Sequence, residues 1–162
     1  GADIMATPYD VIWANLLPKF KSYEIPLMTT EEVKDCLHDY IIPAVSRFHI
    51  CRKDLSNRND ELEQFDSDLS DMEIEILSNY VLLEYLDSTY IRVPSVLKVS
   101  LSSKDFNAFS NANQLEKMME MHSTFLKENE TLLSRYSWNQ TRDDLKNGIK
   151  TSFTEHSYKS KI

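Results

Sequence analysis

Glycine is almost absent from this chain. Only Gly1 and Gly148 occur among 162 residues, where an average usage near 7% predicts about eleven. Loops that bind phosphate groups need several glycines, so the sequence has neither a P-loop nor a dinucleotide-binding fingerprint. The preferred dipeptide of tight hairpins, Asn-Gly, occurs only at Asn147-Gly148, in a polar tail. Because glycine is costly within helices and common in turns, its scarcity favours an all-α, helix-dominated fold.

Long apolar runs and cysteines are also scarce. No stretch approaches the roughly 20 apolar residues of a membrane span, and no basic segment followed by an apolar core indicates a signal peptide. The only two cysteines, Cys36 and Cys51, lack the spacing of metal ligands, so we expect reduced, partly buried thiols. We read Gly1–Ile4 as a cloning scar before a native Met5, residues 5–138 as one helical domain and residues 139–162 as a flexible C-terminal arm.

Positive charge is in short supply. The chain carries 18 basic and 26 acidic residues, a net charge of −8, which argues against general binding of duplex DNA. Residues 139–162 hold five basic and three acidic residues, a net +2, which leaves −10 for the remainder. The candidate acidic surface consists of Asp60, Glu61, Glu63, Asp66, Asp68 and Asp71. We expect this acidic middle and the basic tail to attract each other between copies of the chain.

Helical periodicity and start signals predict a bundle of about four helices. Thr7 and Pro8 resemble an N-cap and first helical residue, and Pro18 should end or kink the helix that follows. Thr29–Glu32 and Ser70–Glu73 are two capping boxes. The first predicts a helix over Thr30–Ile50 with a bend near Tyr40. The second predicts a helix that is apolar on most sides and forms the buried centre.

An acidic loop, a long helix and one ambiguous segment complete the pattern. Residues 54–68 are acidic and read as a loop, with one turn around Leu62 and Phe65. Ser110 caps an apolar stripe of about 25 residues that predicts a long C-terminal helix ending near Trp138, followed by an extended arm. Residues 88–106 fit two alternatives, a short β segment near 90–101 or a short helix from Pro94 to Leu101.

No pattern of catalytic or metal-binding residues survives inspection. His38-Asp39 lacks the preceding histidine that a metal phosphohydrolase of the HD type needs. A calcium loop starting at Asp66 would have Asp71 and Leu77 where glycine and glutamate are required. His122 lies on the apolar stripe without a second histidine four residues away, which favours a core or interface histidine. We therefore expect no enzyme activity, no cofactor and no metal site.

Several short motifs follow one another between Met28 and Trp138. They are the capped helix at Thr29–Phe48, the acidic loop, Leu69-Ser70-Asp71-Met72-Glu73-Ile74-Glu75-Ile76-Leu77, Lys104-Asp105-Phe106, Ser110-Asn111-Ala112-Asn113-Gln114-Leu115 and Tyr136-Ser137-Trp138. In this order, the motifs resemble the small neck or head–tail connector (adaptor) proteins of tailed phages of Gram-positive bacteria.

The resemblance implies a non-enzymatic virion protein that forms a homo-oligomeric ring and docks on the portal, next to other neck and tail proteins. DNA would pass an acidic lumen without sequence-specific binding. The protein would reside in the virion and, during assembly, in the host cytoplasm, with no membrane contact. In such families a C-terminal arm often reaches a neighbour or the portal. The candidate contacts are Tyr136, Trp138, Leu145, Ile149, Phe153 and Tyr158.

Two other interpretations remain open at this stage. Tyrosine and tryptophan near helix ends are also typical of ordinary cores, so the aromatic residues do not by themselves define an interface. An acidic helical module that binds a host or phage protein is the alternative function, because an acidic surface can mimic nucleic acid toward a basic partner.

Overall fold

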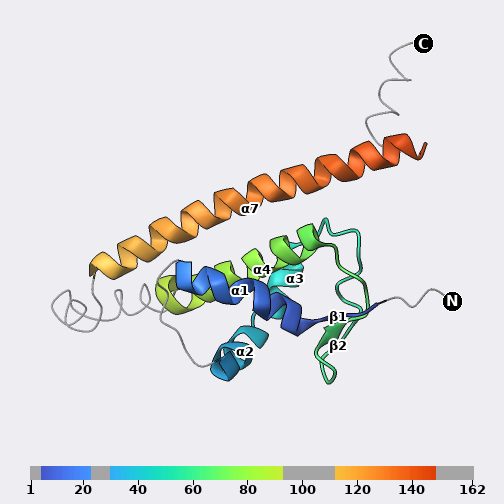
Figure 1. Ribbon diagram of the computed structural model, residues 1–162. Helices are drawn as coiled ribbons and strands as arrows, with labels where there is room; N and C mark the ends of the chain where they lie inside the picture. Colours follow the sequence, from blue (N-terminus) through green and yellow to red (C-terminus); the bar gives the residue numbers. More distant parts are fainter. Residues whose placement is uncertain (1–4, 23–29, 93–111, 149–162) are drawn as a thin grey trace, which may run out of the picture.

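The computed structural model describes residues 5–22, 30–92 and 112–148 of the chain. These residues are mostly helical, and three very short strands form a small sheet (Figure 1). The elements are β1 (Thr7–Pro8), α1 (Tyr9–Ser22), α2 (Thr30–His38), α3 (Ile41–Arg47), β2 (Arg58–Asn59), β3 (Gln64–Phe65), α4 (Asp71–Leu86), the π-helix η1 (Asp87–Arg92) and α7 (Ala112–Lys146). The predicted fold class, a helical bundle with a long C-terminal helix, is confirmed.

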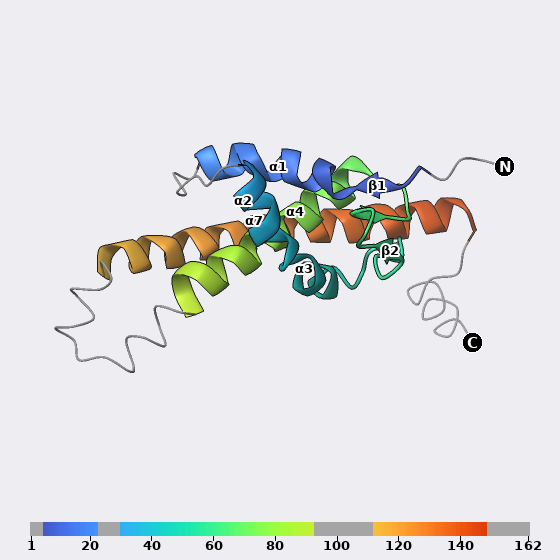
Figure 2. The ribbon, with the colours of Figure 1, turned by 90° about the horizontal axis from the view of Figure 1, so that it is seen from below.

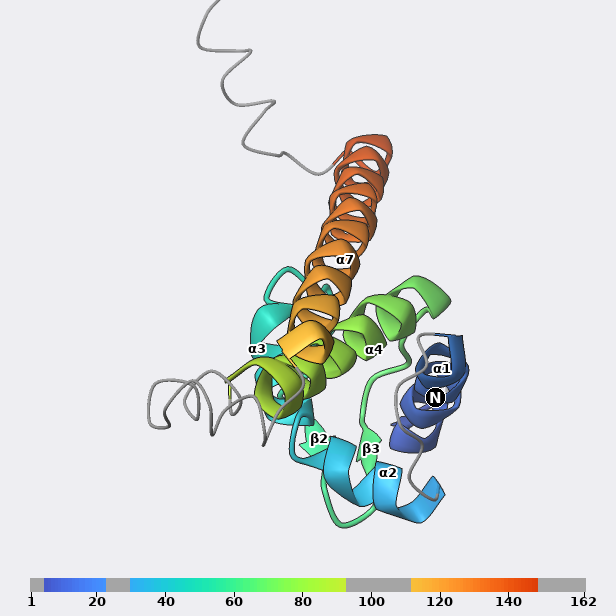
Figure 3. The ribbon, with the colours of Figure 1, turned by 90° about the vertical axis from the view of Figure 1, so that its left-hand side faces the viewer.

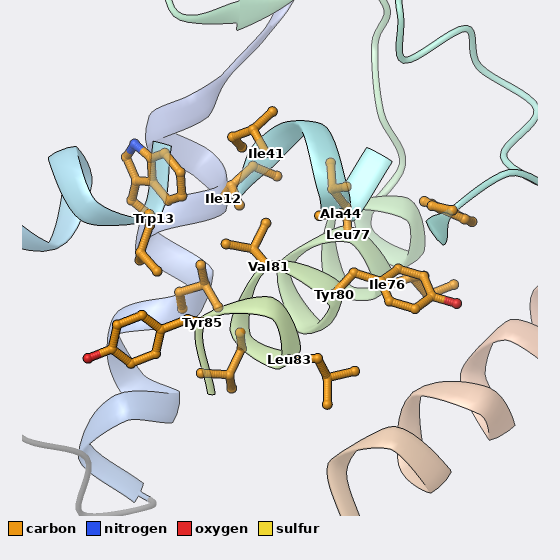
Figure 4. Close-up of a cluster of buried hydrophobic side chains, with 14 of the residues drawn as sticks. Ile12, Trp13, Ile41, Ala44, Ile76, Leu77, Tyr80, Val81, Leu83 and Tyr85 are labelled. Carbon is orange, nitrogen blue, oxygen red and sulfur yellow. The ribbon is translucent and has the colours of Figure 1, made fainter. Parts of the chain in front are cut away.

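Helix α4 is the centre of the molecule, as its composition predicts. Every residue from Ile76 to Leu86 is buried, and α1, α3 and α7 all pack against this helix (Figures 1 and 2). Its Val81 points toward Ile12 of α1 and Ile41 of α3 (Figure 4), and Ile76 and Leu83 belong to the same buried cluster. A helix that is apolar on most sides can bury its side chains only when other elements surround it. This explains why three helices pack against α4.

The capping box at the start of α4 is confirmed atom by atom. The Ser70 hydroxyl accepts a hydrogen bond from the Glu73 N–H at 3.3 Å, and the Glu73 carboxylate accepts one from the Ser70 N–H at 2.8 Å. Two of the N–H groups that a helix N-terminus leaves without partners are thereby satisfied.

The prediction that Thr7 caps the first helix is wrong. Thr7 and Pro8 form strand β1, and the helix begins at Tyr9. The Thr7 hydroxyl donates to the Ser67 carbonyl at 2.8 Å and accepts from the Leu69 N–H at 2.9 Å, so its partners lie about 60 residues away and it caps no helix. Pro18 does not end α1, which continues to Ser22.

The helix predicted over Thr30–Ile50 is divided where the bend was expected. Helix α2 ends at His38, a turn occupies Asp39 and Tyr40, and α3 runs from Ile41 to Arg47. Pro43 falls at the third position of α3, inside the first turn, where its missing N–H costs no helical hydrogen bond. The first capping box begins at Thr29, which lies outside the described residues.

The acidic segment between α3 and α4 is a hairpin, which corrects the expected loop. Strands β2 and β3 pair antiparallel, and β1 joins β3 from the other side, so the strand order is β1-β3-β2. At the tip, the Asn59 side chain accepts hydrogen bonds from the N–H groups of Glu61 and Leu62, both at 3.0 Å. Glu63 adopts a left-handed conformation (φ +49°). An asparagine side chain and a positive φ thus make a turn for which no glycine is present.

Helix α7 is longer than the sequence indicated. It extends to Lys146, eight residues beyond the expected end at Trp138, so the first third of the expected arm is helical. Its buried residues include Met118, Phe125, Asn129 and Tyr136, and they form one stripe toward α4, with α7 running antiparallel to it (Figure 2). Gly148, at φ +72°, stands just past the end of the helix, the usual place for a left-handed glycine.

The ambiguous segment is only partly described. Asp87–Arg92 continues α4 as the π-helix η1, so its first residues are helical. The remaining residues of the proposed β segment, the cap at Ser110 and the arm beyond Gly148 lie outside the described residues. The sheet that is present occupies other positions, at the N-terminus and in the acidic segment.

Replacing Ser70 by alanine tests the contribution of the capping box. We expect Ser70→Ala to lower the free energy of unfolding by about 1 kcal/mol, because the Glu73 N–H loses its acceptor. Urea unfolding followed by circular dichroism measures the change. The matched control is Ser123→Ala at an exposed position within α7, where the change should stay within about 0.5 kcal/mol. Equal effects of the two substitutions would contradict the assignment.

Candidate functional site

The six residues of the candidate acidic surface lie on one continuous piece of chain. Asp60, Glu61 and Glu63 belong to the hairpin tip, Asp66 and Asp68 follow β3, and Asp71 opens α4. All are exposed except Asp66, which is half-buried. Their role in letting DNA pass remains a prediction.

Asp60 has a second, structural use within this surface. It accepts a hydrogen bond from the buried Tyr9 hydroxyl at 2.9 Å and lies 3.6 Å from the Arg58 guanidinium. Burial, reinforced by the Asp60 carboxylate, raises the pKa of Tyr9, so the phenol remains a donor at any physiological pH. The hydrogen bond fixes the hairpin to the start of α1.

The candidate contact residues at the end of α7 separate into two groups. Trp138 is 68% exposed and Leu145 is 45% exposed. They stand two helical turns apart, so they share one face of α7. The buried stripe of α7 faces the opposite way, toward α4. Ile149, Phe153 and Tyr158 lie outside the described residues.

Tyr136 is the exception among these candidates, because its ring is used inside the molecule. It is 6% exposed, and its ring packs edge-on against Phe48 with a centroid distance of 5.4 Å. Its hydroxyl donates to Glu73 Oε1 at 2.8 Å and accepts from the Arg52 N–H at 2.9 Å. Burial raises the pKa of Tyr136. The expectation that Tyr136 contacts a partner is therefore corrected: it joins α7, α4 and the segment after α3.

The last turns of α7 are held to the same segment by Arg52. The Arg52 guanidinium pairs with Asp144 and donates to the Gln140 carbonyl at 3.1 Å. The Gln140 side chain in turn donates to the Ile50 carbonyl at 3.3 Å. A helix end anchored by three polar contacts presents its outer face, with Trp138 and Leu145, in a defined position.

A shallow hollow of about 390 Å³ lies next to Trp138. Its apolar walls are Ile50, Leu133 and the Trp138 indole, and its polar lining consists of hydroxyl groups. No charged side chain lines it. Small apolar hollows bordered by an exposed aromatic ring are typical of surfaces that receive a side chain of a partner.

A larger groove of about 520 Å³ separates α1, α4 and α7, and its polar side chains bind one another. The Lys19 ammonium lies 2.5 Å from Glu75 Oε1 and 2.5 Å from Asn79 Oδ1. Asn15 donates to Glu75 Oε2 at 2.8 Å, and Asn79 donates to the fully buried Asn129 at 3.1 Å. Lys19 and Glu75 therefore neutralise each other and, with Asn15, Asn79 and Asn129, join the three helices across the groove.

The pKa of Glu75 reflects its burial and its hydrogen bonds in the groove. Burial raises it, but the hydrogen bonds from Lys19 and Asn15 outweigh burial, so the pKa of Glu75 lies below its ordinary value. Asn129 and Asn15 each keep one buried polar atom without a hydrogen-bond partner among the described residues. The charged groups of Lys19 and Glu75 thus have hydrogen-bond partners, whereas the two asparagines at the margins of the cluster each retain one unpaired polar atom.

The remaining candidates for chemistry do not assemble into a site in the described ranges. His122 is half-buried, its Nε2 has no hydrogen-bond partner there, and burial lowers its pKa. Burial raises the pKa of the half-buried Cys51 thiol; the side chain of Cys36 is not described.

Within residues 5–22, 30–92 and 112–148, no three His, Cys, Asp or Glu side chains are grouped for a metal ion. None of the helices in these ranges combines the length and apolar character that crossing a membrane requires.

Comparison with protein-family models, with curated proteins and with solved structures finds no match to this chain. Sequence reasoning selected Trp138 and Leu145 as candidate contacts; both are exposed, and their contact with a partner stays a prediction. It missed Leu62, Arg52 and the polar cluster around Lys19. An apolar residue between two acids, as at Glu61-Leu62-Glu63, was the signal available for Leu62.

Removing the Tyr136 hydroxyl tests its structural role. We expect Tyr136→Phe to lower the free energy of unfolding by about 1–3 kcal/mol, because the buried Glu73 oxygen and the Arg52 N–H both lose a partner. Trp138→Phe, an aromatic substitution on the exposed face two residues away, is the control and should change stability by less than about 0.5 kcal/mol. Urea unfolding measures both. A Tyr136→Phe protein as stable as the control would refute the role.

The lowered pKa of Glu75 predicts acid sensitivity. The folded state favours the deprotonated carboxylate of Glu75. Its contribution to stability is therefore complete above the ordinary pKa of glutamate and is lost as the pH falls from there through the lowered pKa of the folded state. Between about pH 6 and about pH 3, Glu75→Gln should therefore lose less stability than the wild type. The control Glu120→Gln, at an exposed position of α7, should follow the wild-type slope. Parallel slopes for all three proteins would contradict the prediction.

Proposed function

We propose that this chain is a non-enzymatic structural protein of a phage particle, a head–tail connector that forms a ring and docks on the portal. The observation that carries the proposal is the outer face of the end of α7. There an exposed tryptophan and an exposed leucine stand on a helix that Arg52 and Tyr136 fix to the body. A large apolar side chain held rigidly in solvent is typical of a surface that a partner covers.

The sequence resemblance over Met28–Trp138 supplies the kind of assembly. The structure is compatible with it in three respects: a helical body, a long C-terminal helix, and an exposed acidic surface that includes the hairpin between β2 and β3. This hairpin lies on the side of the body away from α7 (Figures 1 and 3). A net charge of −8 disfavours binding to the phosphates of passing DNA.

The acidic surface also supports a second candidate function. Five exposed carboxylates along one segment of the chain, Asp60, Glu61, Glu63, Asp68 and Asp71, form the kind of surface that a basic host or phage protein recognises. A regulatory module of this type would bind its partner through this acidic surface and would be insensitive to changes at Trp138. The two functions therefore predict different responses to the same variants.

Binding to the portal tests the connector function. The full chain, mixed with purified portal rings of the same phage, should co-sediment as several copies per ring. Trp138→Ala should weaken this binding by at least about tenfold, because hot spots of interfaces are enriched in tryptophan. Met119→Ala removes an apolar side chain of similar exposure (50%) from the other end of α7 and should have no effect.

Three outcomes decide between the functions. A wild-type chain that neither binds portal nor occurs in purified virions would overturn the connector function. Binding to a basic host protein that is lost on neutralising Glu61 and Glu63, and kept in Trp138→Ala, would establish the regulatory module instead. Binding to the portal with equal losses in Trp138→Ala and Met119→Ala would refute the role assigned to the end of α7.

A further inference from the structure

Large apolar side chains are exposed at several sites of the described residues, Met5, Val11, Ile42 and Met119 among them, and two further sites differ in the charge around them. The first is Leu62, 66% exposed at the tip of the hairpin between β2 and β3. The second is the outer face at the end of α7, with Trp138 at 68% and Leu145 at 45% exposure, next to the hollow bounded by Ile50 and Leu133. We call them the hairpin tip and the helix-end face.

The charges around the two patches are opposite. Leu62 stands between the exposed carboxylates of Glu61 and Glu63. The helix-end face carries the exposed Arg135, Arg142 and Lys146, which lie three, four and eight residues from Trp138 and therefore flank it on the helix surface. Arg142 has Asp143 at 3.8 Å, a long and exposed ion pair that a second carboxylate can readily join or replace.

The two patches cannot meet within one molecule. The hairpin between β2 and β3 and the long helix α7 lie on opposite sides of the body in two views at right angles (Figures 1 and 3). A contact between them must join two copies, and it uses a different surface of each. Such a heterologous contact repeats from copy to copy and closes into a ring when the rotation allows it.

We propose that the hairpin tip of one copy binds the helix-end face of the next. Leu62 packs against the Trp138 indole at the hollow, while Glu61 and Glu63 pair with Arg135 and Arg142. This inference rests on the proposed ring-forming function and names the contact between its subunits.

Both surfaces are held in place before they meet. At the hairpin tip, Asn59 binds the N–H groups of Glu61 and Leu62, and the Glu63 carbonyl accepts from the Tyr9 N–H at 2.8 Å. At the helix-end face, Arg52 holds Asp144 and the Gln140 carbonyl. Surfaces that are already ordered lose little conformational entropy on binding, so a small apolar contact with complementary charges is sufficient in a repeating ring.

Mixing two variants that are each defective on one side tests the contact. Leu62→Asp disables the hairpin tip, and Trp138→Asp disables the helix-end face. In low salt, sedimentation velocity should show oligomers larger than dimers for the wild type at high concentration. Each variant alone should associate at least about tenfold more weakly. The equimolar mixture should form dimers and stop there, because one intact tip can bind one intact face.

Controls and contrary outcomes make the test specific. Met119→Asp, at an exposed apolar position elsewhere on α7, should associate like the wild type, and circular dichroism should show that all variants fold. Raising the salt should weaken wild-type association, because the charge pairs are exposed. A wild-type chain that stays monomeric at its highest soluble concentration overturns the contact, as does a mixture of variants that associates no better than either variant.

The failure of this contact and the failure of the proposed function have different signatures. A chain that binds portal rings in several copies while the mixed variants stay monomeric keeps the connector function and loses the contact. A chain whose variants pair in the mixture but that is absent from virions and portal complexes keeps the contact and loses the function.

Discussion

The arrangement of this protein depends on how one buried carboxylate is satisfied. Glu73 is 4% exposed, and an ionised group at that depth is costly unless hydrogen bonds replace its water. One of its oxygens accepts from the Ser70 N–H and the other from the Tyr136 hydroxyl, which itself accepts from the Arg52 N–H. The start of α4, the last third of α7 and the segment after α3 must therefore pack together, and this condition sets the register of α7 along α4.

The consequence for function is a long helix with two different faces. Toward α4, α7 presents apolar side chains together with Asn129 and Tyr136, which bond to Asn79 and Glu73 of α4. Away from α4, its last turns present Trp138 and Leu145 to solvent. Because Arg52 holds these turns through Asp144 and Gln140, the exposed tryptophan is carried by a fixed surface. A rigid surface of this kind suits assembly better than catalysis, in which reacting groups must converge on a pocket.

The scarcity of glycine has a structural counterpart. Residues 2–147 contain no glycine, and the described turns among them rely on other residues. Asn59 organises the hairpin tip through its side chain, and Glu63 takes the left-handed conformation that glycine usually supplies. The single glycine beyond residue 1 appears at φ +72° just past α7. The chain thus bends at polar turns, and side-chain hydrogen bonds from Asn59 order the hairpin tip.

Local patterns in the sequence determined the helical class, the capping box at Ser70, the burial of α4 and the break near Tyr40, because each follows from neighbours within a turn or two. The C-terminal end of α7, the two-residue strands and the partners of Thr7, Tyr136 and Lys19 could not be predicted in this way. Thr7 meets Leu69, Tyr136 meets Glu73 and Lys19 meets Glu75 across 56 to 63 residues of chain. Such pairs depend on how helices pack. The sequence by itself therefore determined which faces are apolar and that α4 starts after Ser70. Only the tertiary structure decided which buried polar groups satisfy one another and which apolar residues, Leu62 and Trp138 among them, remain exposed.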